Sequence, residues 1–357
     1  MEDSGNLNFN NSNFFIGLDV HKKDWCVTIR SNGMELKKFS MNPSSDELWR
    51  YLIKNYPGGN YLAAYEAGFC GFTHCRRMNE LGIKCIVVNA SDIPTGQFER
   101  VQKTDPRDSR KIARELENNS LKSIYLPARD FEELRSLVRL RHKLTKHQTM
   151  IKNRIKGTLY YYGINIPLRF QTNSRWSMGF IQWLKEIKLT TEAGNFTLQE
   201  NIRTLIEVRT HIKDILLKIR EELKKEEHAK YVEALISVPG IAFLSAAVIY
   251  TEIMDIKRFG NFDELANYAG LIPALHSSGE TEYTKGITKR RNGYLRGALT
   301  ECAWMAVRKD PALTLKFSEL TKRMNKQKAI IRIAKKLLSR IRYVWFNKCE
   351  YVYSLVS

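Results

Sequence analysis

A long stretch of helically spaced apolar residues constrains the fold of this 357-residue chain more than any other feature. The residues on one side of the pattern are Leu134, Leu137, Val138, Leu144, Ile151, Ile155 and Leu159. Leu137, Leu144 and Ile151 are seven residues apart, a spacing typical of helices that pack against a partner along their length. A second helical stretch at residues 205–228 would return antiparallel. We therefore expect a long helical hairpin or coiled coil over residues 128–227.

The chain before Pro127 differs, because short β-rich runs alternate there with helical patterns. Residues 14–30 predict a hairpin of two strands with a break at residues 21–24. The other elements expected are strands at residues 60–66, 82–90 and 122–127 and a helix near residues 71–81. This mixture predicts an α/β domain over residues 14–127, a class of fold that usually builds its sites at strand ends.

Four acidic residues lie where such a domain would build a site. Asp19 ends the first predicted strand and Glu66 ends the strand at residues 60–66. In the stretch KTDPRDSRKIA, Asp105 precedes Pro106, so we expect Asp105 to cap a helix in which Asp108 is the third residue. Both aspartates would then share one helix face. A helix start with a favourable dipole interaction explains this pair equally well, and each acid taken alone could be a cap or a surface residue.

In a protein of this charge, the four carboxylates could also serve as metal ligands. Lys plus Arg number 58 against 38 Asp plus Glu, which gives a net charge of +20. The sequence pI is about 9.6, and such a balance favours a polyanionic partner, nucleic acid before an acidic membrane surface. Phosphodiester chemistry needs hard oxygen ligands that bring one or two Mg²⁺ ions to the reacting oxygens. The four acids would supply these ligands in a groove where basic residues hold the polyanion.

The predicted long helix is itself strongly basic. Residues 131–160 contain eight Lys and Arg residues against two Glu residues. The basic residues are Arg135, Arg139, Arg141, Lys143, Lys146, Lys152, Arg154 and Lys156. A charge run of this kind is often only a solvated helix face, but the imbalance favours contact with phosphates. We therefore expect this helix to bind nucleic acid.

The C-terminal part, residues 228–350, offers two further candidates. The stretch VPGI at residues 238–241 lies between two helical patterns, as in helix-hairpin-helix elements that offer backbone N–H groups to a phosphate; a plain turn is the alternative. The stretch HSSGE at residues 276–280 predicts a turn that presents a serine hydroxyl. The basic residues that follow, with no acid among them, are Lys285, Lys289, Arg290, Arg291 and Arg296. A serine beside this charge is a candidate nucleophile toward phosphate, although Ser-Ser-Gly is also a common turn sequence.

The remaining features of the sequence concern the cellular location of the protein. No stretch reaches the roughly 18 to 20 apolar residues of a membrane span, and the polar, acidic start is unlike a signal peptide, so we expect a cytoplasmic protein. Six irregularly spaced cysteines predict reduced thiols, and Cys70, His74 and Cys75 have no second ligand pair for zinc. We expect residues 1–13 to be disordered, and residues 351–357 form a tail without an assigned function.

Several short motifs occur in an order that resembles a known family. They are FIGLDVHKK, YEAG, KTDPRDSRKIA, VPGI, RFGNFDELANYAGLIP, SSGE, KGITKRRNGYLRGAL and KQKAIIRIAKKLL. The chain is similar, over roughly residues 14–350, to the insertion-sequence transposases of the IS "one-ten" family. The specificity of this resemblance lies in the ordered set, because each motif alone is weak.

The resemblance carries expectations of its own. It implies a RuvC-like (RNase H-like) N-terminal domain with a DEDD carboxylate set, a coiled coil, and a helical C-terminal transposase domain with a nucleophilic serine. The carboxylate set falls on Asp19, Glu66, Asp105 and Asp108. The nucleophile falls on Ser278, and a shift of one residue would exchange it for Ser277. The family also implies a bridge RNA that pairs with donor and target DNA, and a working complex that is a multimer, a dimer or a tetramer.

These observations predict a DNA transposase in which the four carboxylates hold Mg²⁺ at the scissile phosphate and Ser278 attacks it. A covalent serine–DNA link would conserve the phosphoester bond energy and allow strands to be rejoined. Two alternatives stay open on the sequence. One is a RuvC-like nuclease that uses the same carboxylates but activates water. The other is a basic helical scaffold without enzymatic activity that binds RNA or DNA.

Overall fold

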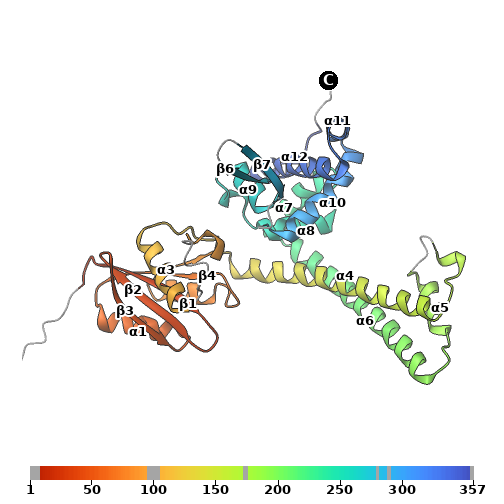
Figure 1. Ribbon diagram of the computed structural model, residues 1–357. Coiled ribbons are helices and arrows are strands. Elements are labelled where there is room, and N and C mark those ends of the chain that lie inside the picture. The colour runs from red at the N-terminus through yellow and green to blue at the C-terminus, as the bar shows by residue number, and fades with distance from the viewer. Residues whose placement is uncertain (1–8, 95–104, 172–175, 279–280, 288–290, 354–357) are drawn as a thin grey trace, which may run out of the picture. The chain divides into compact units, whose positions relative to one another are not determined.

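A computed structural model describes residues 9–94, 105–171, 176–278, 281–287 and 291–353. Within these ranges, the side chains of residues 105–107, 273–278 and 281–287 are not described. The chain forms two compact units, Met1–Leu126 and Pro127–Ser357 (Figure 1). In the described part of the chain, no helix combines the length and the apolar character that a membrane span requires.

The first unit is a five-stranded mixed sheet with helices on both faces. Its strands are β1 (Asn13–Val20), β2 (Trp25–Ser31), β3 (Met34–Met41), β4 (Asn60–Glu66) and β5 (Lys84–Val88). Their order is β3-β2-β1-β4-β5, in which β1, β2 and β3 pair antiparallel and β1, β4 and β5 pair parallel. The helices are α1 (Ser45–Asn55), α2 (Thr73–Glu80), the short η1 (Ala90–Asp92) and α3 (Asp105–Glu117).

Alternation along the strands decides which helix covers which face. Ile16 and Leu18 of β1 pack in one core with Leu48 and Leu52 of α1 and with Met78 of α2. The opposite face carries a smaller core, whose buried members are Ala64, Val88, Ile93 and Ile112, the last of these from α3. The sheet therefore has α1 and α2 on one side and α3 on the other.

The α/β prediction is confirmed for this unit, with one error and two omissions. Residues 122–127 do not form a strand, since Ser123 makes only an isolated bridge to Val88. Ile124 packs against the larger core of the unit and its N–H donates to the Val87 carbonyl oxygen at 2.8 Å, whereas Tyr125 and Leu126 are exposed. Strand β3 and helix α1 were not predicted.

The second unit is built around two long helices, α4 (Arg129–Tyr161) and α6 (Glu192–Leu223). At one end, Ile155 of α4 packs with Leu198 of α6 and Phe180 of α5 (Met178–Glu186), next to the short η3 (Leu168–Phe170). At the other end, Leu134 of α4 and Ile219 of α6 belong to a larger helical core. The two helices therefore run antiparallel, which confirms the predicted long helix and its returning partner, while coiled-coil geometry stays a prediction.

The larger core gathers the rest of the chain. Its helices are α7 (Glu226–Ser237), α8 (Phe243–Ile253), η4 (Ile256–Arg258), α9 (Phe262–Tyr268), α10 (Gly293–Lys309), α11 (Pro311–Thr321) and α12 (Lys326–Asn347). Two strands, β6 (Pro273–Ser278) and β7 (Thr281–Ile287), form an antiparallel pair between α9 and α10 in the sequence.

The Pro-Gly turn between α7 and α8 packs into this core. Pro239 is buried, and Gly240 has φ of +88°. A Cβ atom at Gly240 would lie 2.5 Å from the carbonyl oxygen of Cys302 in α10. Glycine is needed here for both the backbone conformation and the close approach. A helix, turn and helix are thus present as expected, and binding of a phosphate by this turn stays a prediction.

Candidate active site

Asp19 and Glu66 occupy neighbouring places at the carboxyl end of the sheet. The parallel pairing of β1 with β4 runs up to Leu18 and Tyr65, and each carboxylate residue follows directly. Neighbouring strands lie about 4.8 Å apart, so the two backbones are close at this point. Asp19 is also paired with Cys26 of β2, and its Oδ2 lies 3.3 Å from His21 Nε2. The structure therefore brings the first two predicted site residues together at one sheet edge.

Helix α3 packs closely against β1 because residue 17 of that strand is a glycine. A Cβ atom at Gly17 of β1 would lie 2.0 Å from the carbonyl oxygen of Ser109 and 2.4 Å from the backbone nitrogen of Ala113. Only glycine lets the helix backbone come this near to the strand. The buried Ser109 hydroxyl lies 2.9 Å from Thr28 Oγ1 and 3.4 Å from the Sγ of Cys26. Because Cys26 pairs with Asp19, this part of α3 lies near the end of β1 that carries Asp19.

Contacts at the C-terminal end of α3 show in which direction the helix runs. Glu117, its last residue, accepts hydrogen bonds from Arg30 Nε at 2.7 Å and from the Gly33 backbone N–H at 2.7 Å. Arg30 pairs with Phe15, close to the start of β1. Helix α3 therefore runs opposite to β1, so that its N-terminus lies at the end of the sheet where Asp19 and Glu66 are found.

Asp105 and Asp108 are the first and fourth residues of α3. The expected cap at Asp105 is thus itself helical, a shift of one residue that lies within the usual uncertainty of helix ends. Asp108 is half-buried, and the side chain of Asp105 is not described. Among the side chains that the structure describes, no three His, Cys, Asp or Glu residues are grouped closely enough to hold a metal ion. The backbone places all four residues at one end of the unit, and metal binding by them stays a proposal.

The serine candidates lie in the second unit, in a strand rather than in the expected turn. Ser277 and Ser278 are the last two residues of β6, paired with Glu282 and Thr281 of β7. Consecutive strand positions belong to opposite faces, so Ser277 and Ser278 are assigned to opposite faces of the strand pair. The structure describes the backbone of these residues and not their side chains.

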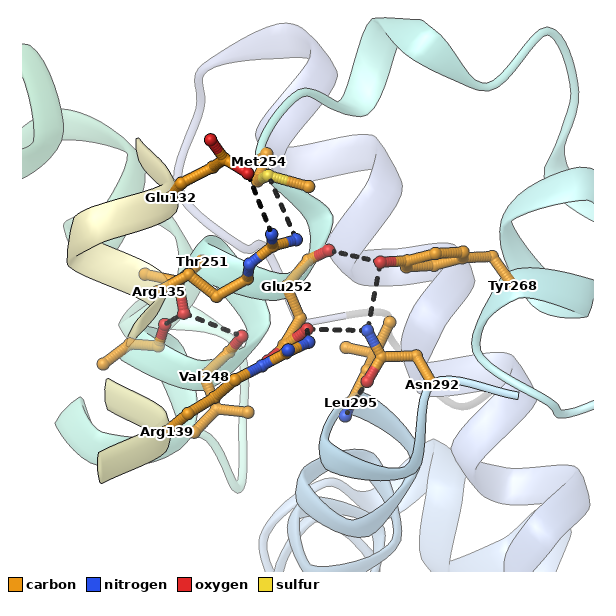
Figure 2. Close-up of polar contacts among 11 residues, drawn as sticks. Glu132, Arg135, Arg139, Val248, Thr251, Glu252, Met254, Tyr268, Asn292 and Leu295 are labelled. Carbon is orange, nitrogen blue, oxygen red and sulfur yellow. Dashed lines mark hydrogen bonds and ion pairs between the residues drawn. The ribbon is translucent and has the colours of Figure 1, made fainter. Parts of the chain in front are cut away.

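A buried carboxylate that the sequence analysis missed lies at the base of this hairpin. The side chain of Glu252, near the end of α8, is only 1% exposed. It accepts two hydrogen bonds of 2.7 Å from Arg139 of α4 and one of 2.7 Å from Asn292 Nδ2, as Figure 2 shows. A buried charge needs such partners. The only signal in the sequence was a single acid in an otherwise apolar helix, AAVIYTEI.

Arg139, which was expected to contact nucleic acid, has an internal partner in Glu252. Its guanidinium also lies over the Tyr294 ring, 4.8 Å from the centroid, and its side chain is 35% exposed. The bonds to Glu252 raise the pKa of Arg139, partly opposed by burial. A guanidinium held on two sides in this way is oriented for a structural role, and contact with a phosphate stays a prediction.

The other predicted basic residues are distributed along both parts of the second unit. Lys143 and Lys146 are exposed on α4, and Arg154 is exposed but donates to Asn201 Oδ1 at 3.2 Å. Burial and nearby Arg209 lower the pKa of Lys152, and Lys156 is half-buried. In the hairpin region, Arg291 is exposed, burial lowers the pKa of Arg296, the side chain of Lys285 is not described, and Lys289 and Arg290 lie outside the described residues.

Comparisons with known proteins identify the family. One family model, described as "Transposase IS116/IS110/IS902 family", matches residues 232–318. Another, a DEDD transposase model of the IS110 group, matches residues 16–164. The putative transposase y4qE of Sinorhizobium fredii is 31% identical over 81% of this chain and 71% of its own length. A second putative transposase of that organism, y4rJ, is 27% identical over 91% of this chain and 89% of its own length.

A third relative, the transposase for insertion sequence element IS1533 of Leptospira borgpetersenii, is 24% identical over 81% of this chain and 84% of its own length. The two models match both units, and the relatives span most of the chain. The chain belongs to the IS110/IS116/IS902 family of transposases. The DEDD model covers the sheet and α3, the region where the structure gathers the four acidic residues.

Proposed function

We propose that this transposase cuts and rejoins DNA through attack of Ser278 on the scissile phosphate, with Asp19, Glu66, Asp105 and Asp108 holding Mg²⁺. The observation that carries the proposal is the packing of α3 on Gly17, because it brings the start of that helix to the strand ends of Asp19 and Glu66. Family membership supports the same reaction, since a DEDD-type domain suggests use of a divalent metal.

The four acids fit the proposed ion by chemistry and by placement. They are hard oxygen donors, which Mg²⁺ prefers, and they come from two strand ends and one helix start of a single unit. Bound Mg²⁺ would offset the charge that develops on the phosphate oxygens. Asp108 is half-buried at the first turn of α3, where the helix dipole favours a negative side chain.

The serine step conserves bonds. The Ser278 hydroxyl loses its proton as its oxygen forms a bond to phosphorus, and the bond from phosphorus to the leaving deoxyribose oxygen breaks, with that oxygen taking up a proton. The DNA hydroxyl of a second strand then attacks the phosphoserine and releases the serine. One phosphoester is exchanged for another in each step, so strand joining needs no external energy source. The basic residues from Lys285 to Arg296 would orient the DNA and stabilise the transition state.

We assign these roles to three functional parts. Residues 14–127 form the RuvC-like carboxylate domain, residues 128–227 the helical linker, and residues 228–350 the transposase domain with the serine. The exposed basic residues of α4, Lys143, Lys146 and Arg154, offer a suitable surface for RNA, which proteins hold largely through phosphates and shape. We propose that a bridge RNA from the element selects donor and target DNA, and that the working complex is a homo-oligomer, a dimer or a tetramer.

The proposal is tested by covalent capture. Purified protein is incubated with Mg²⁺, labelled DNA from the flanks of its own reading frame and RNA transcribed from those flanks, and denaturing gels are examined for a protein–DNA adduct. Ser278→Ala should abolish the adduct, Ser277→Ala should retain it, and a chelator should prevent it. Cleavage by Ser278→Ala at the rate of the unsubstituted protein would instead establish a nuclease that uses water.

Retention of every activity in Asp105→Asn would exclude the carboxylate mechanism. If neither DNA cleavage nor an adduct occurs while RNA and DNA bind tightly, the protein is a nucleic-acid scaffold under these conditions. Either result would overturn the proposed function.

A further inference from the structure

We propose that Glu252 is a positioning residue that holds the base of the β6–β7 hairpin and thereby fixes where Ser278 is presented. This inference rests on the proposed function for the role of Ser278, but the structural device stands on residues that the structure describes. Tyr268, Gly270, Arg291 and Asn292 make up what we call the neck, the two chain segments that flank the hairpin.

The neck is closed by backbone contacts. The N–H of Asn292 donates to the carbonyl oxygen of Tyr268 at 3.0 Å, so the chain returns to the point from which it departed. Gly270 has φ of +68°, and a Cβ atom there would lie 2.4 Å from Cβ of Arg291. The two sides of the neck are therefore too close for any side chain at residue 270. The hairpin has a narrow base whose orientation depends on what holds these residues.

Glu252 is bonded to both sides of the neck. Its carboxylate accepts from Asn292 Nδ2 at 2.7 Å, and its backbone carbonyl oxygen accepts from the Tyr268 hydroxyl at 2.9 Å. The Nδ2 of Asn292 lies 3.0 Å from the same hydroxyl oxygen, and Oδ1 of Asn292 caps α10 by accepting from the Leu295 N–H at 3.0 Å. Figure 2 shows how these contacts converge. Both ends of the Asn292 amide are thus used, which fixes its orientation.

Arg139 ties this arrangement to the long helix. Its two bonds to Glu252 are bidentate, a geometry that fixes direction as well as distance. Its stacking on Tyr294 adds a contact with the first turn of α10. The neck is therefore held between α4, α8 and α10. Loss of the Glu252 charge would leave Arg139 without its carboxylate and Asn292 without one acceptor, and the base of the hairpin would lose its fixed direction.

A second buried carboxylate in the same unit offers a matched control. Asp310 is 2% exposed, pairs with Arg340, accepts from the Tyr351 hydroxyl at 2.7 Å and caps α11 through the Leu313 N–H at 3.1 Å. Its chemistry resembles that of Glu252, but none of these partners belongs to the neck. A general loss of stability should follow either substitution, whereas a change in the hairpin should follow only one.

The experiment compares Glu252→Gln with Asp310→Asn in the full-length protein. Three quantities are measured: the rate of adduct formation at saturating DNA and RNA, the affinity for the same labelled DNA by fluorescence anisotropy, and amide hydrogen exchange of peptides from β6 and β7. A small misplacement of a reacting group can lower a rate on the order of 100-fold. We expect Glu252→Gln to slow adduct formation by about 10- to 100-fold with DNA affinity changed less than about twofold, and to speed exchange in the hairpin.

Asp310→Asn should leave the hairpin exchange unchanged. Adding Arg139→Gln to Glu252→Gln should partly restore the rate, because the unpaired buried charge is then removed. Equal slowing by Glu252→Gln and Asp310→Asn, or unchanged hairpin exchange in Glu252→Gln, would overturn the proposal while leaving the serine mechanism intact. If Ser278→Ala still forms the adduct, the proposed function fails, and the hydrogen exchange result alone decides whether Glu252 holds the neck.

Discussion

The two groups of candidate residues are placed in different ways. In the first unit, Asp19 and Glu66 are positioned by strand pairing, and the start of α3 is positioned by a backbone contact at Gly17. In the second unit, the base of the β6–β7 hairpin is closed by backbone contacts at Tyr268 and Gly270 and is also held by side chains, chiefly Glu252 and Arg139. The first arrangement follows from topology and one missing Cβ atom. The second depends on a buried charge network, which is sensitive to single-atom changes.

The largest effect is expected from the carboxylates of the first unit. Asp108→Asn keeps the size of the side chain but removes a charged oxygen from the proposed Mg²⁺ site, and we expect adduct formation to fall by about 100-fold or more. The control is Glu80→Gln, since Glu80 is an exposed residue on the surface of the same unit, where it pairs with Arg77. The rate of adduct formation by Asp108→Asn should not recover when the Mg²⁺ concentration is raised within the physiological range. Full activity in Asp108→Asn would remove this residue from the site.

The next largest effect is expected from two glycines, Gly17 and Gly240, that allow a helix backbone to pack closely against them. Gly17→Ala forces α3 away from β1, and Gly240→Ala forces α10 away from the Pro-Gly turn. Overpacking of this kind costs about 1–3 kcal/mol, and the positive φ of Gly240 adds strain. Hydrogen exchange should rise in α3 for the first variant and in α10 for the second. Exchange that rises equally in both helices for either variant would show that the two units do not respond separately.

A smaller effect is expected from lysines on the two long helices. Lys143 and Lys146 are exposed on α4, whereas Lys218 of α6 is paired with Glu221 and Glu222. Replacing both α4 lysines by Gln should weaken RNA binding several-fold and lower the salt slope of log K by roughly one to two. Lys218→Gln should change neither quantity. Identical salt slopes for all variants would exclude the α4 face as a phosphate-binding surface.

The smallest effect concerns pH. Burial, with Lys146 and Arg141 nearby, lowers the pKa of His142 below its ordinary value of 6.5. The unfolded chain therefore binds the proton first, so the free energy of unfolding should decrease as the pH falls below about 6.5. In the first unit, burial lowers the pKa of His74 in the same direction. Denaturation of His142→Gln between pH 7.5 and 5.5 should show a weaker pH dependence than the unsubstituted protein. An unchanged dependence would assign the effect to other groups.

The sequence was sufficient for much of the first unit. Strands β1, β2, β4 and β5 are apolar runs bounded by turn residues. Asp19 and Glu66 lie at the ends of β1 and β4, and Asp105 begins α3, as the sequence predicted. Strand β3 was missed because its side chains are mostly exposed and include two lysines. The apolar stretch around Ile124 was mistaken for a strand, because a short apolar run does not by itself specify strand pairing.

In the second unit, the long helices were predictable from the sequence, but a long-range ion pair was not. Regular apolar spacing predicted α4, since helix periodicity is a local property. The pairing of Arg139 with Glu252 joins residues 113 positions apart, and it exists only because α4 packs against α8. Arg139 therefore has an internal partner that its basic run does not reveal, and its contact with a phosphate stays a prediction. Buried ion pairs of this kind depend on tertiary packing, which residue types alone do not specify.

The most direct measurement is the chemical identity of the DNA linkage. The adduct formed with Mg²⁺ is digested with nuclease and protease, and the modified peptide is sequenced by mass spectrometry. We predict a nucleotide joined through phosphate to Ser278, within the peptide that contains β6. A nucleotide on Ser277 would contradict the assignment to Ser278, and a nucleotide on a residue other than these two serines, or complete cleavage without a modified peptide, would contradict the serine mechanism.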